Sequence, residues 1–353
     1  MPTQQVSSPL EYATTTDGVS VAFTAEGNGP PLVLPAMGPL RTLQIERRIK
    51  SWRDWYGELA RTSKVVRYDG RGTGLSSGPV DFGLSARLAD LEAVTDVLGA
   101  PVFDLMAIRP SGPAAIAYTV RHPERVGHLI LWCTYDRGTE YFGAPNALNF
   151  FAGIEADWAG YIETVVRDRL GATGALAEHV TATLRSTFSR NVQRRFATQG
   201  LATDVSGILG QVQAPTLVVH RSQLRFPSID VAMRMSAKIP QARFVLLDGS
   251  SAAPFIGDGD SVEIVNRFLG RPTESFVAPV VAPGTASPAD LLSNREWDVL
   301  RLMVDGLSNQ EIADTLLISL HTVKSHAQSI MSKLNVSSRT AVIAVARNLN
   351  LLS

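Results

Sequence analysis

The sequence SLHTVKSHAQSIMSKL, residues 319–334, is the strongest single indication of how the C-terminal part of this chain folds. At helical spacing, Val323, Ala327, Ile330 and Leu334 fall on one side and form an apolar seam. The other side carries hydroxyl, amide, imidazole and ammonium groups and no carboxylate. Such a helix can pack its seam on a small core and turn a donor-rich face toward DNA phosphates and base edges. The same pattern also fits an ordinary amphipathic surface helix.

The flanking residues place this segment third in a group of short helices. Residues 293–304 open with a helix-start sequence, Ser-Asn-Arg-Glu, and a glycine follows their last apolar residues. Ser308 can cap a second helix over residues 309–316, with Glu311 at the third position as in a capping box. A fourth helix is predicted over residues 337–349, beginning with Ser-Ser-Arg.

The motifs REW followed by VL, GLSNQEIA, TVKSH, KL and SRT all lie within residues 292–352. By these motifs the segment closely resembles the LuxR-type helix-turn-helix domain. The resemblance implies that residues 291–353 form a small all-α domain that binds double-stranded DNA. It places the following residues at the DNA: Asn309, Thr322, Val323, Lys324, His326, Lys333 and Arg339.

The resemblance also implies a homodimer on a two-fold operator with half-sites about one helical turn apart. In this family the fourth helix commonly pairs two domains, and here it carries Val342, Val345, Ala346 and Leu349. The alternative for these residues is packing on the core of their own domain.

The charge distribution agrees with a DNA-facing third helix, although the formal net charge of the chain is zero. Residues 287–318 hold two arginines against six acids, whereas residues 319–353 hold two lysines and two arginines and no acid. The positive potential is therefore concentrated on the part that carries the third helix, as phosphate contact requires.

The remaining composition fits a protein of the cytoplasm. Cys133 is the single cysteine among 353 residues, so no internal disulfide can form and a reducing compartment is expected. The N-terminal residues lack a signal-peptide pattern, and no apolar run is long enough to cross a membrane. We expect neither a metal nor a cofactor.

Before the helical segment, short apolar strands alternate with amphipathic helices. A hairpin is predicted over residues 10–25, with its turn at Asp17 and Gly18. Further strands are predicted at 31–35, 64–68, 102–106, 128–133, 216–220 and 243–247, and helices at 51–62, 84–98, 111–122, 229–239 and 261–269. Alternation of this kind predicts a mostly parallel sheet with helices on both faces.

Four segments carry a resemblance to the α/β-hydrolase fold: DGRGTGLS at 69–76, FDLMAIRPSGPAAIAY at 103–118, HPERVGHLIL at 122–131 and APTLVVH at 214–220. The resemblance spans roughly residues 10–270, and we assign residues 1–270 to this domain, with a helical cap inserted at about 138–205. We expect Asp69, Arg71, Gly72 and Gly74 to hold a loop together. Residues 271–290, rich in proline, serine, threonine and glycine, read as a linker between the two domains.

The hydrolase resemblance fails where that fold carries its nucleophile. The strand-to-helix turn is AIRPS, residues 107–111, which puts Arg109 at the nucleophile position. A guanidinium is never deprotonated in proteins and cannot attack a carbonyl. Pro110 follows and has no N–H for an oxyanion. Because a residue before proline favours extended backbone, the turn could also be less sharp than in hydrolases.

The acid and the base are missing as well. No carboxylate occurs between His220 and Asp230, and Ala252 stands where the general base is expected. No histidine lies between His220 and His321, so moving the nucleophile to Ser111 would still leave the triad incomplete. We therefore predict that the chain is not an enzyme.

A pocket without catalytic residues can still bind a ligand. We expect a small effector to contact Met37, Arg109, Pro110, Phe142, Phe151, Trp158 and Ala252, although cap aromatics can equally serve to bury the cap. The charge of Arg109 needs a partner. One alternative is an acidic ligand, and the other is an internal salt bridge to Asp136, Glu155 or Asp157.

The function predicted from the sequence is a ligand-sensing, DNA-binding transcription regulator. Two alternatives remain open at this point. One is a hydrolase with a DNA-binding tail, and the other is a sensor domain that binds a protein partner.

Overall fold

The computed structural model describes residues 9–170, 172, 174–256, 261–272, 294–316, 318–333 and 342. The chain divides into two compact units, Met1–Val281 and Ala282–Ser353. Among the described residues, no helix combines the length and the apolar character needed to span a bilayer.

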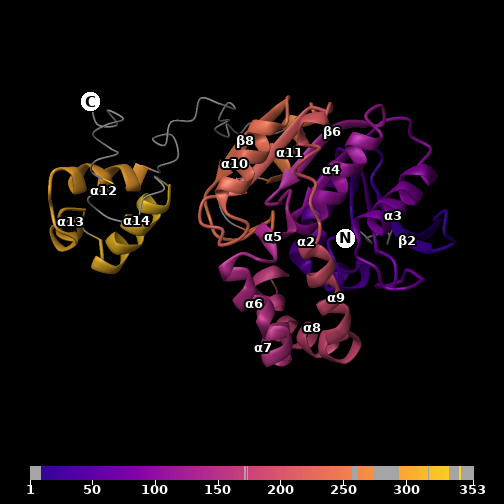
Figure 1. Ribbon diagram of the computed structural model, residues 1–353, viewed down its shortest axis with the longest axis horizontal. Coiled ribbons are helices and arrows are strands. Elements are labelled where there is room, and N and C mark those ends of the chain that lie inside the picture. Colours follow the sequence, from indigo (N-terminus) through magenta and orange to yellow (C-terminus); the bar gives the residue numbers. More distant parts are fainter. Residues whose placement is uncertain are drawn as a thin grey trace, which may run out of the picture. The chain divides into compact units, whose positions relative to one another are not determined.

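The larger unit is built on one eight-stranded sheet (Figure 1). The first two strands form the predicted antiparallel hairpin, the second also pairs antiparallel with the strand at residues 64–68, and all other neighbours are parallel. In sheet order the strands are β1 (Leu10–Thr14), β2 (Ser20–Glu26), β4 (Lys64–Tyr68), β3 (Pro31–Leu34), β5 (Phe103–Ile108), β6 (Val126–Trp132), β7 (Thr216–Arg221) and β8 (Ala242–Leu247). The prediction of a mostly parallel α/β-hydrolase-like sheet is confirmed.

Helices pack on both faces of the sheet. One face carries α3 (Leu84–Val97), α4 (Gly112–Arg121) and α10 (Ile229–Lys238), and the other carries α2 (Lys50–Ala60) and α11 (Ser261–Phe268).

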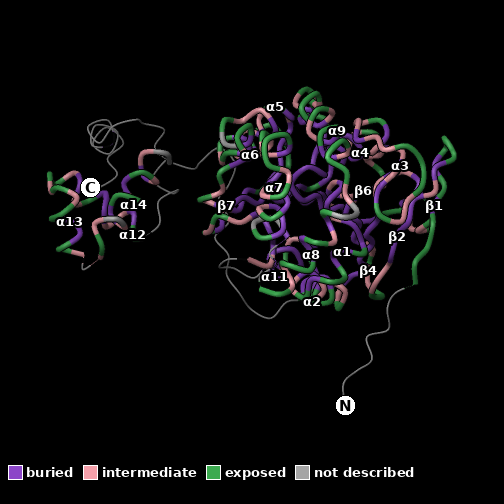
Figure 2. The backbone as a smooth tube through the Cα atoms, turned by 90° about the horizontal axis from the view of Figure 1, so that it is seen from below, coloured by how far each residue is buried: buried purple, intermediate pink, exposed green. Residues whose placement is uncertain are grey.

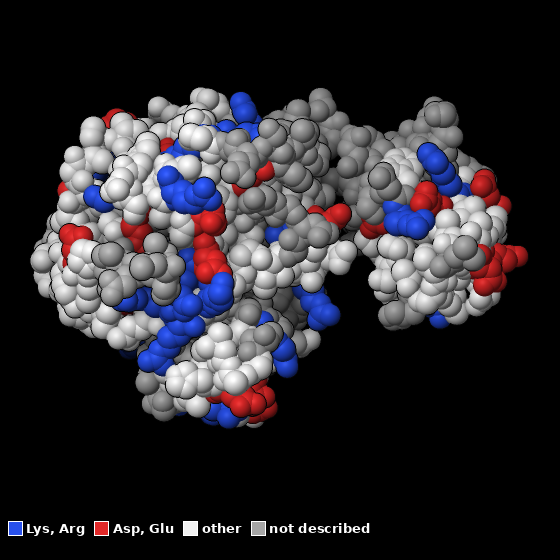
Figure 3. Space-filling model, turned by 180° about the vertical axis from the view of Figure 1, so that it is seen from behind, with Lys and Arg blue, Asp and Glu red and all other residues white. Residues whose placement is uncertain are grey.

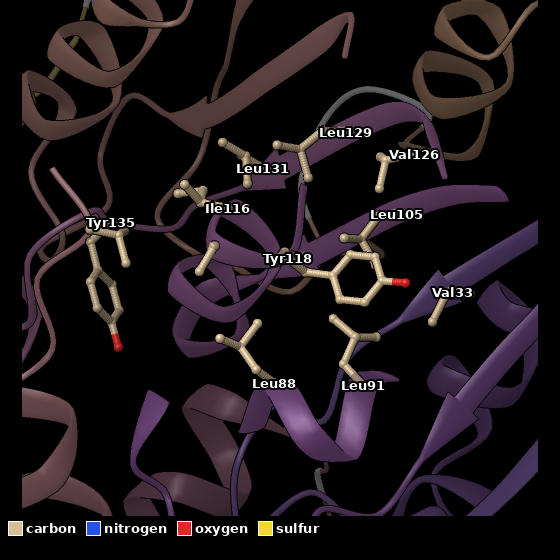
Figure 4. Packing of buried hydrophobic residues seen from close by; sticks show 14 of the residues in the cluster. Val33, Leu88, Leu91, Leu105, Ile116, Tyr118, Val126, Leu129, Leu131 and Tyr135 are labelled. Atoms are coloured by element: carbon tan, nitrogen blue, oxygen red, sulfur yellow. The ribbon is translucent and has the colours of Figure 1, made fainter. Parts of the chain in front are cut away.

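Strand β6 shows how the two faces are kept apart, because successive side chains of a strand point to opposite sides. Leu129 and Leu131 enter one core, where Leu88 of α3 also lies (Figure 4), whereas Ile130 and Trp132 enter the other. The strands at the centre of the unit are accordingly buried along their length (Figure 2).

The cap consists of five helices between β6 and β7 (Figure 1): α5 (Gly138–Tyr141), α6 (Pro145–Ala156), α7 (Trp158–Thr164), α8 (Gly174–Thr187) and α9 (Arg190–Leu201). Its two ends are joined by backbone hydrogen bonds, from Gly138 N to Thr203 O at 2.7 Å and from Val205 N to Asp136 O at 2.9 Å. The insertion therefore leaves the sheet and returns at one place. A short helix outside the cap, α1 (Leu43–Arg48), was not predicted.

The loop after β4 is held by its own side chains, as predicted. The two carboxylate oxygens of Asp69 accept hydrogen bonds from the backbone N–H of Leu43 and of Leu75, at 2.8 and 2.9 Å. The Nε of Arg71 donates to Asp90 Oδ1 at 2.8 Å. Burial raises the pKa of Asp69 to about 6, because the charged carboxylate is cut off from water. These residues have a structural role.

The start of the predicted linker belongs to the sheet unit instead. Arg271 is buried, and its Nη2 donates to Asp104 Oδ2 at 2.6 Å at the beginning of β5. The guanidinium also contacts the Ser63 hydroxyl. The other oxygen of Asp104 lies 2.8 Å from His128 Nδ1. A buried ion pair of this kind fixes the chain, so an extended connector cannot begin at residue 271; residues 273–290 lie outside the described part.

The smaller unit contains α12 (Asn294–Val304), α13 (Asn309–Leu316) and α14 (Leu320–Lys333), close to the predicted bounds. The predicted capping box is confirmed: Ser308 N donates to Glu311 Oε2 at 2.7 Å, and Glu311 N donates to Ser308 Oγ at 3.3 Å. The core of the unit includes Val299, Leu300, Met303, Ile312, Ala313, Val323, Ala327, Ile330 and Val342.

The predicted fourth helix lies outside the described residues, with the exception of Val342. Val342 is fully buried in the core of its own unit. It is therefore not available to a surface that pairs two domains, and Val345, Ala346 and Leu349 stay predictions.

We expect Gly74→Ala to destabilise the larger unit more than Gly99→Ala. Both glycines have positive φ, 55° and 64°, which costs an alanine about 1 kcal/mol in either place. A Cβ at Gly74 would also lie 2.0 Å from Asp69 Oδ2, whereas Gly99 faces open space. Displacing that carboxylate from its two N–H partners should add about 1–3 kcal/mol, measured by denaturant unfolding. Equal losses in the two variants would contradict this account of the loop.

Candidate functional site

The turn between β5 and α4 keeps the sharp geometry of a nucleophile elbow. Arg109 has φ 53°, in the left-handed region that non-glycine residues rarely adopt. The hydroxyl of Thr134 donates to Arg109 O at 2.5 Å and holds this conformation. A Cβ at Gly112 would lie 1.8 Å from Thr134 Oγ1, so only glycine fits there. The expectation that Pro110 would relax the turn is wrong, because these contacts override the local preference.

The Ser111 side chain is engaged within the turn. It is fully buried, and its Oγ donates to Ile108 O at 3.0 Å while accepting from Ile108 N at 2.8 Å. The hydroxyl is thus part of the turn itself, and its hydrogen is donated inside it.

The ends of β7 and β8 carry structural contacts where hydrolases carry the acid and the base. The Nη1 of Arg221 donates to Asp248 O at 2.7 Å, and its Nη2 donates to Ile256 O at 2.6 Å. Ala252 is buried, and its carbonyl accepts a hydrogen bond from Trp132 Nε1 at 3.1 Å. These contacts tie loops to the sheet.

His220 is the histidine of β7, and it is fully buried. Its Nδ1 lies 2.9 Å from Arg221 O, which assigns the proton to that nitrogen. Burial lowers the pKa of His220 to about 4, so the ring stays neutral near neutral pH.

Arg109 projects from the elbow and is held by the cap. Its Nε and Nη2 donate to the hydroxyl of Tyr141, at 3.1 and 3.0 Å, and its guanidinium lies 5.6 Å from the centre of the Phe226 ring. The side chain is only 8% exposed. A neutral hydroxyl and an aromatic face stabilise a cation weakly compared with a carboxylate.

The three carboxylates that could have paired with Arg109 are engaged elsewhere. Asp136 pairs with Arg234 at 2.8 Å and Glu155 with Arg194 at 2.6 Å. Asp157 caps α7 through the backbone N–H of Gly160. Within the described residues, Arg109 takes part in no ion pair. Among the described residues, the alternative of an internal salt bridge from Arg109 to one of these acids is therefore not found.

A cavity lies over Arg109 between the sheet and the cap. Its empty volume is about 540 Å³, part of it open to solvent. It is lined by Met37, Gly38, Pro39, Leu40, Arg41, Arg109, Pro110, Tyr141, Phe150, Phe151, Tyr161, Val165, Gln193 and Phe196. We call this the cap cavity. Its wall is mostly apolar, with a few polar groups, which is typical of small-molecule sites.

Four of the predicted ligand residues line the cap cavity: Met37, Arg109, Pro110 and Phe151. Ala252 lines a second cavity beside it, which shares Arg109 and Phe150 with the first.

Phe142 and Trp158 line neither cavity. Phe142 is buried behind the wall, with its ring centre 5.1 Å from that of Phe151. Trp158 stacks on Tyr161 at 5.6 Å. These two aromatic residues therefore pack the cap, which was the alternative to their predicted contact with a ligand.

Gln193 is a cavity residue that the sequence analysis missed. It is 2% exposed, its Nε2 donates to Tyr161 Oη at 2.8 Å, and its Oε1 has no hydrogen-bond partner among the described residues. The available signal was positional. Gln193 falls on the buried face of α9 with Phe196 and Gly200, and a polar side chain on such a face needs an explanation.

In the smaller unit, the exposed face of α14 carries Lys324, whereas Thr322 and His326 are half-buried. Ser319 caps the helix by accepting a hydrogen bond from Thr322 N at 3.1 Å. Val323 is fully buried in the core, so its predicted contact with DNA is wrong. The apolar seam of the helix already required this position to face inward.

The other predicted DNA residues are only partly described. Asn309 is half-buried at the start of α13. The side chain of Lys333 and the whole of Arg339 lie outside the described residues. On the face of the larger unit shown in Figure 3, basic side chains gather in a band, and acidic side chains lie along part of its border.

Residues 290–346 match the family of bacterial regulatory proteins described as the luxR family. The chain is 47% identical over 62 residues to the transcriptional regulatory protein DegU of Brevibacillus brevis, which covers 17% of this chain and 26% of that protein. It is 44% identical over 79 residues to the nitrate/nitrite response regulator protein NarP of Escherichia coli, covering 22% and 34%. The chain thus spans about a quarter to a third of the length of these relatives. Its C-terminal part is a LuxR-family domain.

The larger unit is similar to solved hydrolases. A hydrolase from Pseudomonas aeruginosa superposes with a TM-score of 0.61 and 23% identity, over 74% of this chain and 98% of that one. The 2-hydroxy-6-oxo-6-phenylhexa-2,4-dienoate hydrolase of a Rhodococcus species gives a TM-score of 0.60 at 16% identity, over 75% and 100%. At these identities the similarity establishes the α/β-hydrolase fold.

We expect the stability of the larger unit to fall as pH decreases from 6.5 to 4, in part because of His220. Its pKa is about 4 in the fold against an ordinary 6.5, so the unfolded chain binds the proton first. The neutral His220 ring contributes about 3 kcal/mol to the free energy of unfolding above pH 6.5, and this contribution is lost as the pH falls to 4. Denaturant unfolding at several pH values should show that the free energy of unfolding changes less with pH in His220→Asn than in the wild type. Identical slopes would contradict the assignment, and an NMR titration of the ring provides a second measurement.

Proposed function

We propose that this chain is a transcription regulator whose LuxR-family domain binds double-stranded DNA and whose hydrolase-fold domain binds a small acidic effector without turning it over. The observation that carries the effector proposal is Arg109. It stands at the nucleophile position, faces a mostly apolar cavity and takes part in no ion pair with a described residue. A carboxylate in the cavity would supply the missing counter-charge through a two-pronged hydrogen bond.

The absence of turnover is supported by the chemistry of the elbow. Arg109 cannot act as a nucleophile, Pro110 has no N–H to donate, and the Ser111 hydroxyl is bound within the turn. The scaffold retains the position of a hydrolase site and offers a fixed cation there. An ester-hydrolysis assay with saturable product formation that is lost on substitution of Ser111 would contradict this part.

DNA binding is supported by the family match and by α14. Lys324 is exposed on a helix whose opposite side is buried in the core, so its ammonium group can reach a phosphate. A homodimer on a two-fold operator is part of the proposal, by analogy with the family. The effector would act by binding one arrangement of the two domains better than another, which shifts the population and with it the affinity for DNA.

We expect Lys324→Ala to weaken binding of the full chain to a mixed-sequence DNA duplex about five- to tenfold at low salt. Loss of one phosphate contact should also reduce the slope of log K against log salt by about one. Fluorescence anisotropy at several salt concentrations measures both quantities. The control is Lys238→Ala, at an exposed lysine of the larger unit. The proposal fails here if Lys324→Ala matches the control in affinity and in salt slope.

We expect Arg109→Met to abolish binding of small acids while DNA binding is retained. Benzoate, phenylacetate, 3-phenylpropanoate and hexanoate at millimolar concentration provide the probes, and at least one should raise the Tm of the wild type, because a ligand specific for the fold stabilises it. Arg190→Met, at an exposed arginine of the cap, is the matched control and should respond as the wild type does. No Tm increase with any of these acids in the wild type would contradict an acidic effector.

A further inference from the structure

The cap cavity contains a second polar position, which Arg109 does not explain. Gln193 is almost completely buried on α9, and only one of its two amide atoms has a protein partner, the hydroxyl of Tyr161 at 2.8 Å. The orientation of the amide does not alter this. If the oxygen and nitrogen were exchanged, the hydroxyl would donate to the oxygen, and the nitrogen would then lack a described partner.

A buried amide atom without a partner is costly, by a factor of about ten to a hundred in an equilibrium constant. Protein cores therefore rarely retain one, and the buried face of α9 would have accepted an apolar residue beside Phe196. Gln193 lines the cap cavity, so a ligand held there is placed to bring a polar group to this side chain.

Tyr161 contributes the second half of this polar position. Burial raises the pKa of its phenol, so the hydroxyl stays protonated. When its oxygen accepts the hydrogen bond from Gln193, its own hydrogen remains available for another acceptor. Tyr161 and Gln193 together thus offer one donor and one acceptor, and a ligand hydroxyl can satisfy both, since it donates and accepts at one atom.

The two polar positions are separated by an aromatic wall. The ring of Tyr141, which holds Arg109, lies 6.4 Å from that of Phe151. Phe151 lies 5.1 Å from Phe150, and Phe150 lies 4.9 Å from Tyr161. A ligand that reaches both ends therefore needs an apolar middle part that can lie against these rings.

We propose that the effector is a hydroxylated carboxylic acid with an apolar middle part, with its carboxylate at Arg109 and its hydroxyl at Gln193 and Tyr161. This rests on the proposed function and specifies the ligand of the same cavity. Arg109 selects for the acid, whereas Gln193 selects for the hydroxyl. A site built to hydrogen-bond a hydroxyl discriminates strongly against an analogue that lacks it, because its own polar atoms are then left unpaired.

The test compares two matched pairs of probes on the full chain by calorimetry: 3-(4-hydroxyphenyl)propanoate with 3-phenylpropanoate, and 6-hydroxyhexanoate with hexanoate. The wild type should bind the hydroxylated member of at least one pair about tenfold or more tightly than its partner. In Gln193→Met the preference should disappear, with binding of the plain acid unchanged or tighter. Gln193→Leu is the second variant if the first does not fold, and Gln213→Met, at an exposed glutamine, is the control.

The outcomes separate the two proposals. If the wild type binds the plain acids as tightly as the hydroxylated ones, or if Gln193→Met keeps the preference, the role of Gln193 is overturned while acid binding at Arg109 stands. If no acid binds at all, the effector proposal falls and the present inference falls with it. Loss of the preference in the control as well would also overturn the assignment, because the effect would then not be specific to the cavity.

Discussion

The proposed binding site of the larger unit depends on the guanidinium of Arg109. A cation that is 8% exposed loses most of its hydration, and a hydroxyl and a ring face replace only part of it. The turn that carries it is itself unusual, with φ 53° held by Thr134 and by the absence of a side chain at Gly112. An unfavourable backbone conformation and an incompletely compensated charge at one residue are more typical of a binding site than of a structural one.

The cap and the sheet meet at this residue through aromatic contacts. Tyr141 bonds Arg109 and stacks on Tyr135 with a centroid distance of 4.6 Å, and Phe226, from the loop after β7, packs 5.6 Å from Tyr141. The cap is also anchored where it leaves the sheet, by the ion pair of Asp136 with Arg234 of α10. Arg109 of the sheet part and Tyr141 of the cap are therefore in direct contact in the wall of the cavity.

Local sequence patterns predicted the secondary-structure elements well. They did not predict the features that depend on contacts between residues far apart in the sequence. Strand alternation and the capping box at Ser308 depend on neighbours in sequence, and both were predicted correctly. The direction of a cap aromatic depends on partners far along the chain, so Phe142 and Phe151 could not be told apart beforehand. Gln193 was not predicted as a cavity residue, because it is distinguished by a buried amide oxygen without a described partner, and no sequence pattern indicates this. The inward direction of Val323, in contrast, follows from its place in the apolar seam of the helix.

The ion pair of Arg271 with Asp104 has a practical consequence for dividing the chain. A fragment that ends at residue 270 would remove the counter-ion of a carboxylate that is only 9% exposed at the start of β5, the strand that leads to Arg109. Such a fragment would be less stable for a reason unrelated to effector binding, because a buried carboxylate without its guanidinium partner strongly destabilises a fold. A fragment that contains only the hydrolase-fold part should therefore extend beyond Arg271, so that its guanidinium keeps its bond to Asp104 at the start of β5.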